Sequence, residues 1–134
     1  MHTAELLARL AAALRTEIGP AVEGEYPRTQ AFMAGVILER VSRELALDAQ
    51  HAAAAAADGT ALRADLDPVL AAGPPPVRVA LDRWAEAACA IHALTPLIEA
   101  LYAWGPDEPA AVDALALIRP VLRRDIDRRM EIAQ

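Results

Sequence analysis

The sequence predicts an all-α fold: an up-and-down helical bundle of four main helices and one short helix, in a single domain spanning residues 1–134. Three observations support this prediction. Apolar residues recur every three or four positions, and no segment alternates apolar and polar residues with a period of two. Alanine, the strongest helix former, occupies 33 of the 134 positions. Because alanine is small, the helices of such a bundle can approach one another closely.

The first two predicted helices are long and have clear ends. The first begins at Thr3, which suits an N-cap, and ends at Gly19, which a proline follows. After a loop of sequence AVEGEYP, the second begins near Pro27, because proline is favoured in a first helical turn. It continues to Asp58-Gly59, where the glycine suits a C-cap. The apolar side of the first helix is a run of leucines at helical spacing: Leu6, Leu7, Leu10 and Leu14.

A short third helix is predicted over residues 60–72. Pro68 lies inside it and is expected to break it, because proline has no backbone N–H to donate. The sequence GPPP at residues 73–76 then forms a stiff, extended connector.

The remaining two helices also contain prolines. One is predicted over residues 77–104, and Pro96 must kink or split it. The last begins after Pro106 or Pro109 and reaches about residue 131. Within it, Pro120 removes one bond of the backbone hydrogen-bond ladder.

Composition and charge argue against several classes of protein. A net charge of -6 argues against a general nucleic-acid binder, whose affinity comes from neutralising phosphates. Cys89 is the only cysteine, so the chain has no intramolecular disulfide and no cysteine zinc cluster. The first twenty residues lack the apolar core of a signal peptide, and no apolar run reaches the ~20 residues that a membrane helix needs. We therefore expect a cytoplasmic protein without a membrane segment.

One stretch of the second helix, YPRTQAFMAGVILERVSREL at residues 26–45, carries charges in an unusual place. Its apolar residues cover a broad arc, and Ser42 and Arg43 fall in the remaining gap, which we expect to face solvent. Arg40 and Glu44, however, project into the apolar arc, one turn apart. Two interpretations are open. The pair either snorkels at the edge of the arc, or belongs to a buried polar line that faces another helix, a partner or a ligand.

The second interpretation defines a candidate ligand-binding or partner-binding site. Asp48 and His51 continue the polar line at intervals of three or four residues. A buried charge pair is costly unless a third group completes it, and the candidates for that group are Glu23, Glu25, Tyr26 and Arg28. The geometry favours partial burial, so we expect the replacement of Arg40 by methionine to destabilise the chain clearly. The candidate site consists of Arg28, Arg40, Glu44 and His51.

The C-terminal segment concentrates positive charge. Residues 119–131 carry five arginines against three acids. Arginines suit a helix C-terminus because they interact favourably with the helix dipole. Alternatively, they form a basic patch that meets an acidic partner or a phosphate. This candidate partner-facing patch comprises Arg119, Arg123, Arg124 and Arg128.

Neither a metal site nor a catalytic site is favoured by the sequence. His92 shares a helix face with Glu99, but seven residues separate them by ~10 Å, too far for both to bind one ion. A metal-dependent enzyme would require His51 or His92 to meet acids from other helices. The chain has no GxSxG motif, no glycine-rich phosphate loop and no Cys-His motif. We expect no metal, no cofactor and no catalytic residue.

Three segments within residues 5–47 carry a family resemblance: Leu-Leu…Leu…Glu-Ile-Gly-Pro, Tyr-Pro-Arg-Thr-Gln-Ala and Ile-Leu-Glu-Arg-Val-Ser-Arg-Glu-Leu. They resemble a group of small bacterial helical proteins whose genes often accompany aminoglycoside-phosphotransferase-like kinases and acyl-CoA dehydrogenases. The matching residues are Arg28, Ala31, Leu38, Arg43, Glu44 and Leu45. The resemblance implies an accessory role in acyl-CoA or hydroxyacyl metabolism, with a protein partner from one of those two classes. It implies no catalytic residues.

The sequence as a whole favours a non-catalytic accessory or interaction subunit. The alternative is a helical bundle that binds an apolar or acyl ligand beside Arg40 and Glu44, and a third class is the metal-dependent enzyme described above. The second helix is apolar over more than half of its circumference, which exceeds what neighbouring helices of one chain can cover. We therefore also expect a homodimer, most simply a two-fold one.

Overall fold

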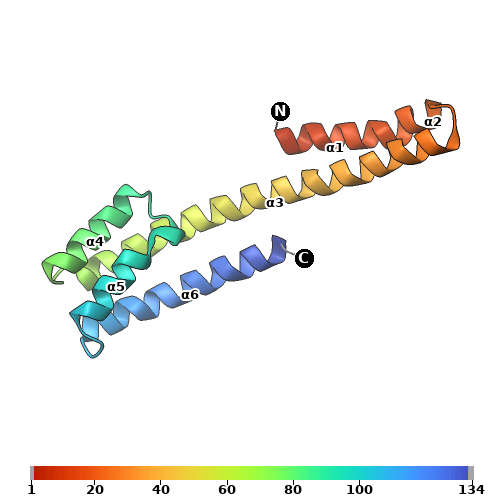
Figure 1. The fold of residues 1–134 in the computed structure, drawn as a ribbon. Helices are drawn as coiled ribbons and strands as arrows, with labels where there is room; N and C mark the ends of the chain where they lie inside the picture. Colours follow the sequence, from red (N-terminus) through yellow and green to blue (C-terminus); the bar gives the residue numbers. More distant parts are fainter. Residues whose placement is uncertain (1, 133–134) are drawn as a thin grey trace. The chain divides into compact units, whose positions relative to one another are not determined.

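The computed structural model describes residues 2–132, which form helices joined by short turns (Figure 1). Within that range the chain contains no strand, so the predicted all-α class is confirmed. The helices fall into two compact units, Met1–Gln50 and His51–Gln134. The long helix α3, Glu25–Leu70, contributes its first part to one unit and the remainder to the other. The single domain predicted from the sequence stays a prediction, since two compact units can belong to one domain.

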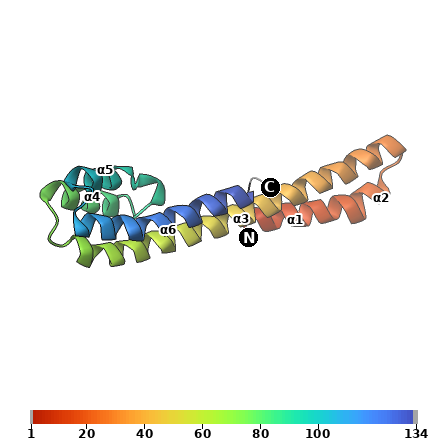
Figure 2. The same ribbon diagram turned by 90° about the horizontal axis from the view of Figure 1, so that it is seen from below.

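The first unit is a helical hairpin, and we call it the hairpin. One arm comprises α1 (Thr3–Ala13), the π-helical turn η1 (Leu14–Ile18) and α2 (Gly19–Ala21). The other arm is the first part of α3, and the two arms lie side by side in both views (Figures 1 and 2). The chain reverses at a turn that contains Gly24, whose φ of +96° suits a residue without a Cβ.

The ends of these helices differ slightly from the prediction. Thr3 is the first helical residue and not the cap; His2 takes the N-cap position without a side-chain hydrogen bond. The second arm begins at Glu25, so Pro27 lies in its first turn, where its missing N–H costs no hydrogen bond.

The two arms of the hairpin pack through small residues. A Cβ added at Gly35 would lie 3.1 Å from the carbonyl oxygen of Ala11, so the two backbones come close there. Two turns further along α3, the hydroxyl of Ser42 donates a hydrogen bond to the carbonyl oxygen of Ala4 at 2.6 Å. Arg15 forms an ion pair with Glu39 from one arm to the other. Close backbone approach of this kind leaves no space between the arms for large side chains.

The second unit contains the hydrophobic core. It comprises the remainder of α3, α4 (Pro75–Glu86), the 3₁₀ turn η2 (Ile91–Ala93), α5 (Thr95–Trp104) and α6 (Pro109–Ile132). Trp84 is buried, and its indole N–H donates to the carbonyl oxygen of Ala90 at 2.8 Å. The buried core residues are Leu62, Leu66, Leu70, Val77, Leu81, Trp84, Ile91, Leu94, Leu97, Leu101, Ala111, Ala114, Leu115, Ile118 and Val121.

The predicted helix end at Asp58-Gly59 is wrong, because α3 continues to Leu70 and absorbs the predicted short helix over 60–72. Gly59 is buried inside α3, where a Cβ would collide with the carbonyl oxygen of Cys89. The glycine therefore provides space for a neighbouring backbone and does not cap the helix. Pro68 does not break α3 either, since only the final turn of the helix follows it.

The remaining prolines behave in two ways. The helix predicted over 77–104 is indeed split. Its first part, α4, ends at Glu86, and Pro96 lies in the first turn of the next helix, α5. The connection includes Ala88 and Cys89, whose φ values of 56° and 55° are left-handed. Pro120, in contrast, lies inside α6, and the helix continues through it.

Candidate functional site

The apolar side of the hairpin's α3 arm faces away from α1. The sequence predicted that the arc containing Ser42 would face solvent and that the apolar arc would face a neighbouring helix. The structure reverses this assignment: Ser42 is buried against α1, and Ile37, Val41 and Leu45 are exposed. The physical reason is the close approach of the two backbones at Gly35, which admits only small residues between the arms.

An apolar stripe on α1 joins this surface. Helical periodicity places Leu6 and Leu10 on one flank of the α1–α3 contact, and antiparallel packing brings the stripe of α3 to the same flank. We call the resulting surface the apolar face. Its exposed members are Leu6 (57%), Leu10 (45%), Ile37 (58%), Val41 (38%) and Leu45 (40%).

The apolar face is as large as the largest apolar patch on an ordinary protein surface. Its five members together expose roughly 450 Å², within the range of about 300–600 Å² for such patches, which are often functional. Half-buried residues border it on the same flank, namely Leu7, Leu14 and Leu38. Met33, Phe32 and Val36 are also exposed and continue the apolar surface around α3. Such a contiguous patch is typical of an interaction surface.

Arg40 and Glu44 pair with each other at the edge of the apolar face. Nε of Arg40 lies 2.9 Å from Oε1 of Glu44, and the two side chains are 77% and 47% exposed. The expected partial burial of the pair is therefore wrong within this chain, because no other helix of the hairpin covers the outer side of α3. An exposed i, i+4 pair of this kind contributes about 0.3–0.5 kcal/mol.

The other two residues of the candidate site lie elsewhere. Nε of Arg28 donates to the carbonyl oxygen of Val22 at 2.7 Å, which ties the start of α3 to the preceding turn. His51 belongs to the second unit, where its Nε2 lies 3.2 Å from Oε2 of Glu131. The structure thus brings Arg40 and Glu44 together, but it does not join Arg28 and His51 to them.

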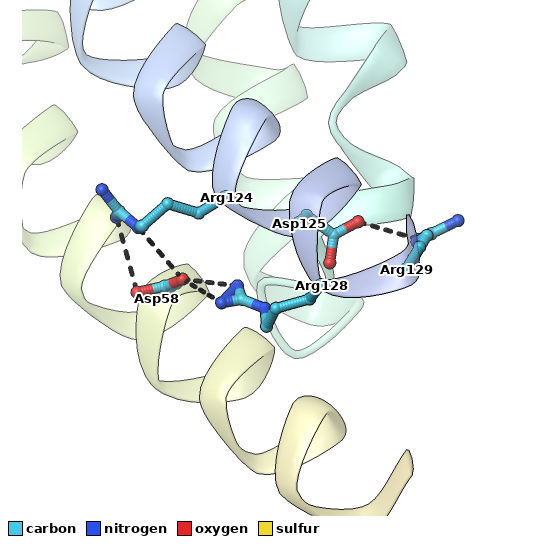
Figure 3. Close-up of polar contacts among 5 residues, drawn as sticks. All are labelled: Asp58, Arg124, Asp125, Arg128 and Arg129. Atoms are coloured by element: carbon cyan, nitrogen blue, oxygen red, sulfur yellow. Dashed lines mark hydrogen bonds and ion pairs between the residues drawn. The ribbon is translucent and has the colours of Figure 1, made fainter. Parts of the chain in front are cut away.

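Two of the four residues of the predicted basic patch, Arg124 and Arg128, bind Asp58 inside the second unit (Figure 3). Asp58 of α3 accepts hydrogen bonds from Arg128 at 2.6 and 2.9 Å and from Arg124 at 3.4 Å. Arg119 and Arg123 are exposed. No local pattern in the sequence indicates this cluster, because Asp58 is 66 and 70 residues away from its two arginine partners in the chain.

Other polar side chains of the second unit pair along single helices. Asp125 is bonded to Arg129 at 2.9 Å (Figure 3), and these two residues and His92 line a shallow space of about 350 Å³ beside the alanines of α3. A hydrogen bond to Asp67 raises the pKa of Arg63 above its ordinary value, which keeps that guanidinium charged. Over residues 2–132 no three His, Cys, Asp or Glu side chains come together as metal ligands.

The hairpin also has an open groove of about 540 Å³. Its walls come from both arms and carry mostly small side chains. The residues that line the groove are His2, Thr3, Ala4, Glu5, Ala8, Ser42, Leu45, Ala46 and Ala49. Arg40 and Glu44 are not among them. Leu45 belongs to both the groove and the apolar face. The groove is therefore a margin of the apolar face and not an enclosed ligand cavity.

Comparisons with protein-family models, with curated proteins and with solved structures found no match to this chain. In the described part of the chain, no helix combines the length and the apolar character needed to cross a membrane.

Proposed function

We propose that this chain is a non-catalytic interaction subunit in which the hairpin docks a protein partner through the apolar face. The second unit serves as the folded anchor of that hairpin. The observation that supports this proposal is the distribution of buried apolar residues. Among the described residues, sixteen hydrophobic ones are buried, and Ala11 is the only one of these sixteen that belongs to the hairpin.

A helical pair without a core of its own needs another source of stability. Isolated helices are marginal in water, and most helical stability in proteins comes from packing of an apolar face. The hairpin buries small residues between its arms and leaves its large ones exposed or only half-buried, so its own packing removes little apolar surface from water. A partner that covers the apolar face would supply the missing packing.

The finer parts of this proposal come from the sequence. The accessory role in acyl-CoA or hydroxyacyl metabolism, and a phosphotransferase-like kinase or an acyl-CoA dehydrogenase as partner, rest on the family resemblance alone. The cytoplasmic location rests on the composition of the chain. A ligand site beside Arg40 and Glu44 is not part of the proposal, because the groove of the hairpin is lined by other residues.

Site-specific photocrosslinking in the native host tests the proposal. A photoreactive phenylalanine analogue would replace Val41, within the apolar face, and in a matched control it would replace Arg43, whose exposed side chain points away from that face. We expect discrete protein adducts from position 41 and none of comparable yield from position 43. No adduct at position 41, or the same adducts from both positions, would contradict the proposal.

A further inference from the structure

We infer that the C-terminal part of α6, residues 123–131, is a hinged flap that opens away from α3 at Pro120 and is held closed by a cluster of polar contacts. We call this segment the flap. The flap and the residues that hold it all belong to the second unit. The inference therefore goes beyond the proposed function and does not depend on the docking role of the hairpin.

The first argument is the burial of apolar side chains along α6. Those before the flap are buried in the core of the second unit: Ala111, Ala114, Leu115, Ile118 and Val121. The two apolar side chains of the flap, Ile126 and Met130, are 56% and 59% exposed. Because burial of apolar surface is the main source of stability, the flap is held much less firmly than the first part of the same helix.

The second argument is the position of Pro120, next to the last buried residue of α6. Proline has no backbone N–H, so it cannot donate to the carbonyl oxygen of Ala116, four residues earlier. α6 continues through Pro120, but helices bend most readily where a proline interrupts the hydrogen-bond ladder. The weakest point of the backbone thus coincides with the boundary between the anchored part of α6 and the flap.

The third argument is the nature of the contacts between the flap and α3, which we call the clasp. Asp58 accepts hydrogen bonds from Arg128 at 2.6 and 2.9 Å and from Arg124 at 3.4 Å (Figure 3). Nε2 of His51 lies 3.2 Å from Oε2 of Glu131. Asp58 and Arg128 are only 23% and 16% exposed, so their pairing is well shielded from water. Removing the charge of Asp58 therefore breaks most of the clasp without changing the apolar core.

The closed position of the flap is imperfectly packed. Nδ1 of His51 and Nε of Arg128 are buried, and neither has a hydrogen-bond partner among residues 2–132. Opening returns both atoms to water, which lowers the cost of opening. Asp125 and Arg129 of the flap also line the hollow of about 350 Å³ beside the alanines of α3. Opening at this side disrupts little close packing, so the flap is poised to move.

Distances between pairs of nitroxide labels, measured by pulsed electron paramagnetic resonance on the full chain, test the inference. The labels are attached to introduced cysteines after Cys89→Ser removes the native thiol. One pair joins Val79 of α4 to Met130 of the flap, and both positions are exposed. The matched control pair joins Val79 to Ala116, which is exposed and precedes Pro120.

Asp58→Asn should open the flap and leave the rest of the second unit in place. We expect the ratio of open to closed chains to rise at least about tenfold, seen as a new distance for the flap pair, because two arginines lose their carboxylate. The distance of the control pair should stay unchanged. Asp127→Asn, a like change at an exposed position of the flap, should move neither pair. An unchanged flap pair, or equal changes in both pairs, would overturn the inference.

Pro120→Ala tests the hinge. Alanine restores the missing N–H, so the hydrogen-bond ladder runs unbroken from the anchored part of α6 into the flap. In a chain that also carries Asp58→Asn, this change should return most of the flap pair to its original distance. If the flap opens to the same extent with alanine at position 120, Pro120 is not its hinge and the inference fails.

Discussion

The two parts of α3 show the same apolar spacing and opposite burial. Leu62, Leu66 and Leu70 recur every four residues and are 2%, 0% and 1% exposed. Ile37, Val41 and Leu45 recur at the same interval in the hairpin and are all exposed. Apolar periodicity therefore identifies the apolar side of a helix, but it does not determine whether the rest of the chain covers that side. In the second unit the cover comes from α4, α5 and α6; in the hairpin we propose that it comes from a protein partner.

The polar pairs of the two units differ in the same way. Asp58 joins α3 to α6 through Arg124 and Arg128, and the Asp58 and Arg128 side chains are only 23% and 16% exposed. Arg40 and Glu44 join two positions of one helix and remain open to solvent. The first cluster fixes tertiary structure, whereas the second is free to interact beyond the chain. Three measurements on the purified chain test this comparison.

The largest expected difference concerns core packing. Leu66→Ala should lower the free energy of unfolding by about 3 kcal/mol, because it leaves a cavity at a fully buried position. Leu10→Ala, at an exposed leucine of the hairpin, should change it by no more than ~0.5 kcal/mol. Urea unfolding followed by circular dichroism gives both values. Equal losses would mean that the hairpin has a core of its own and would break the comparison.

A smaller loss is expected from Gly59→Ala. The added Cβ meets the backbone of Cys89, and overpacking of this kind typically destabilises a protein by about 1–3 kcal/mol. The higher helix propensity of alanine offsets up to ~1 kcal/mol of that loss. We expect a net destabilisation of about 1–2 kcal/mol in urea unfolding monitored by Trp84 fluorescence. Thr60→Ala, at the exposed neighbouring position, is the control and should be nearly neutral. A neutral Gly59→Ala would show that this close approach is not needed.

The smallest difference concerns charge coupling. A double-mutant cycle with Asp58→Ala and Arg128→Ala should give a coupling energy of about 1–3 kcal/mol, because the pair is largely shielded from water. The same cycle with Arg40→Met and Glu44→Leu should give about 0.5 kcal/mol or less in the single chain. Coupling at Arg40 and Glu44 as large as at Asp58 would show that the hairpin covers this pair by itself.

Local sequence patterns determined much of the helical structure. Alanine content and three-to-four-residue spacing predicted an all-α chain, because helix formation depends on backbone hydrogen bonds between residues four apart. Pro27 and Pro109 correctly marked helix starts, and Pro96 correctly marked a split, since proline tolerates a first turn. The pairing of Arg40 with Glu44 was also predictable, because both residues belong to one helical turn.

Only the tertiary structure decided which helix surfaces are covered. Gly59 suited a helix end in sequence, and the approach of the Cys89 backbone made it a buried packing position instead. Asp58 gained its arginine partners from a helix some seventy residues away. Ser42 became buried and Val41 exposed because small residues let α1 approach on one side of α3. Such choices depend on packing between segments far apart in the chain, and local propensity contains no information about that packing.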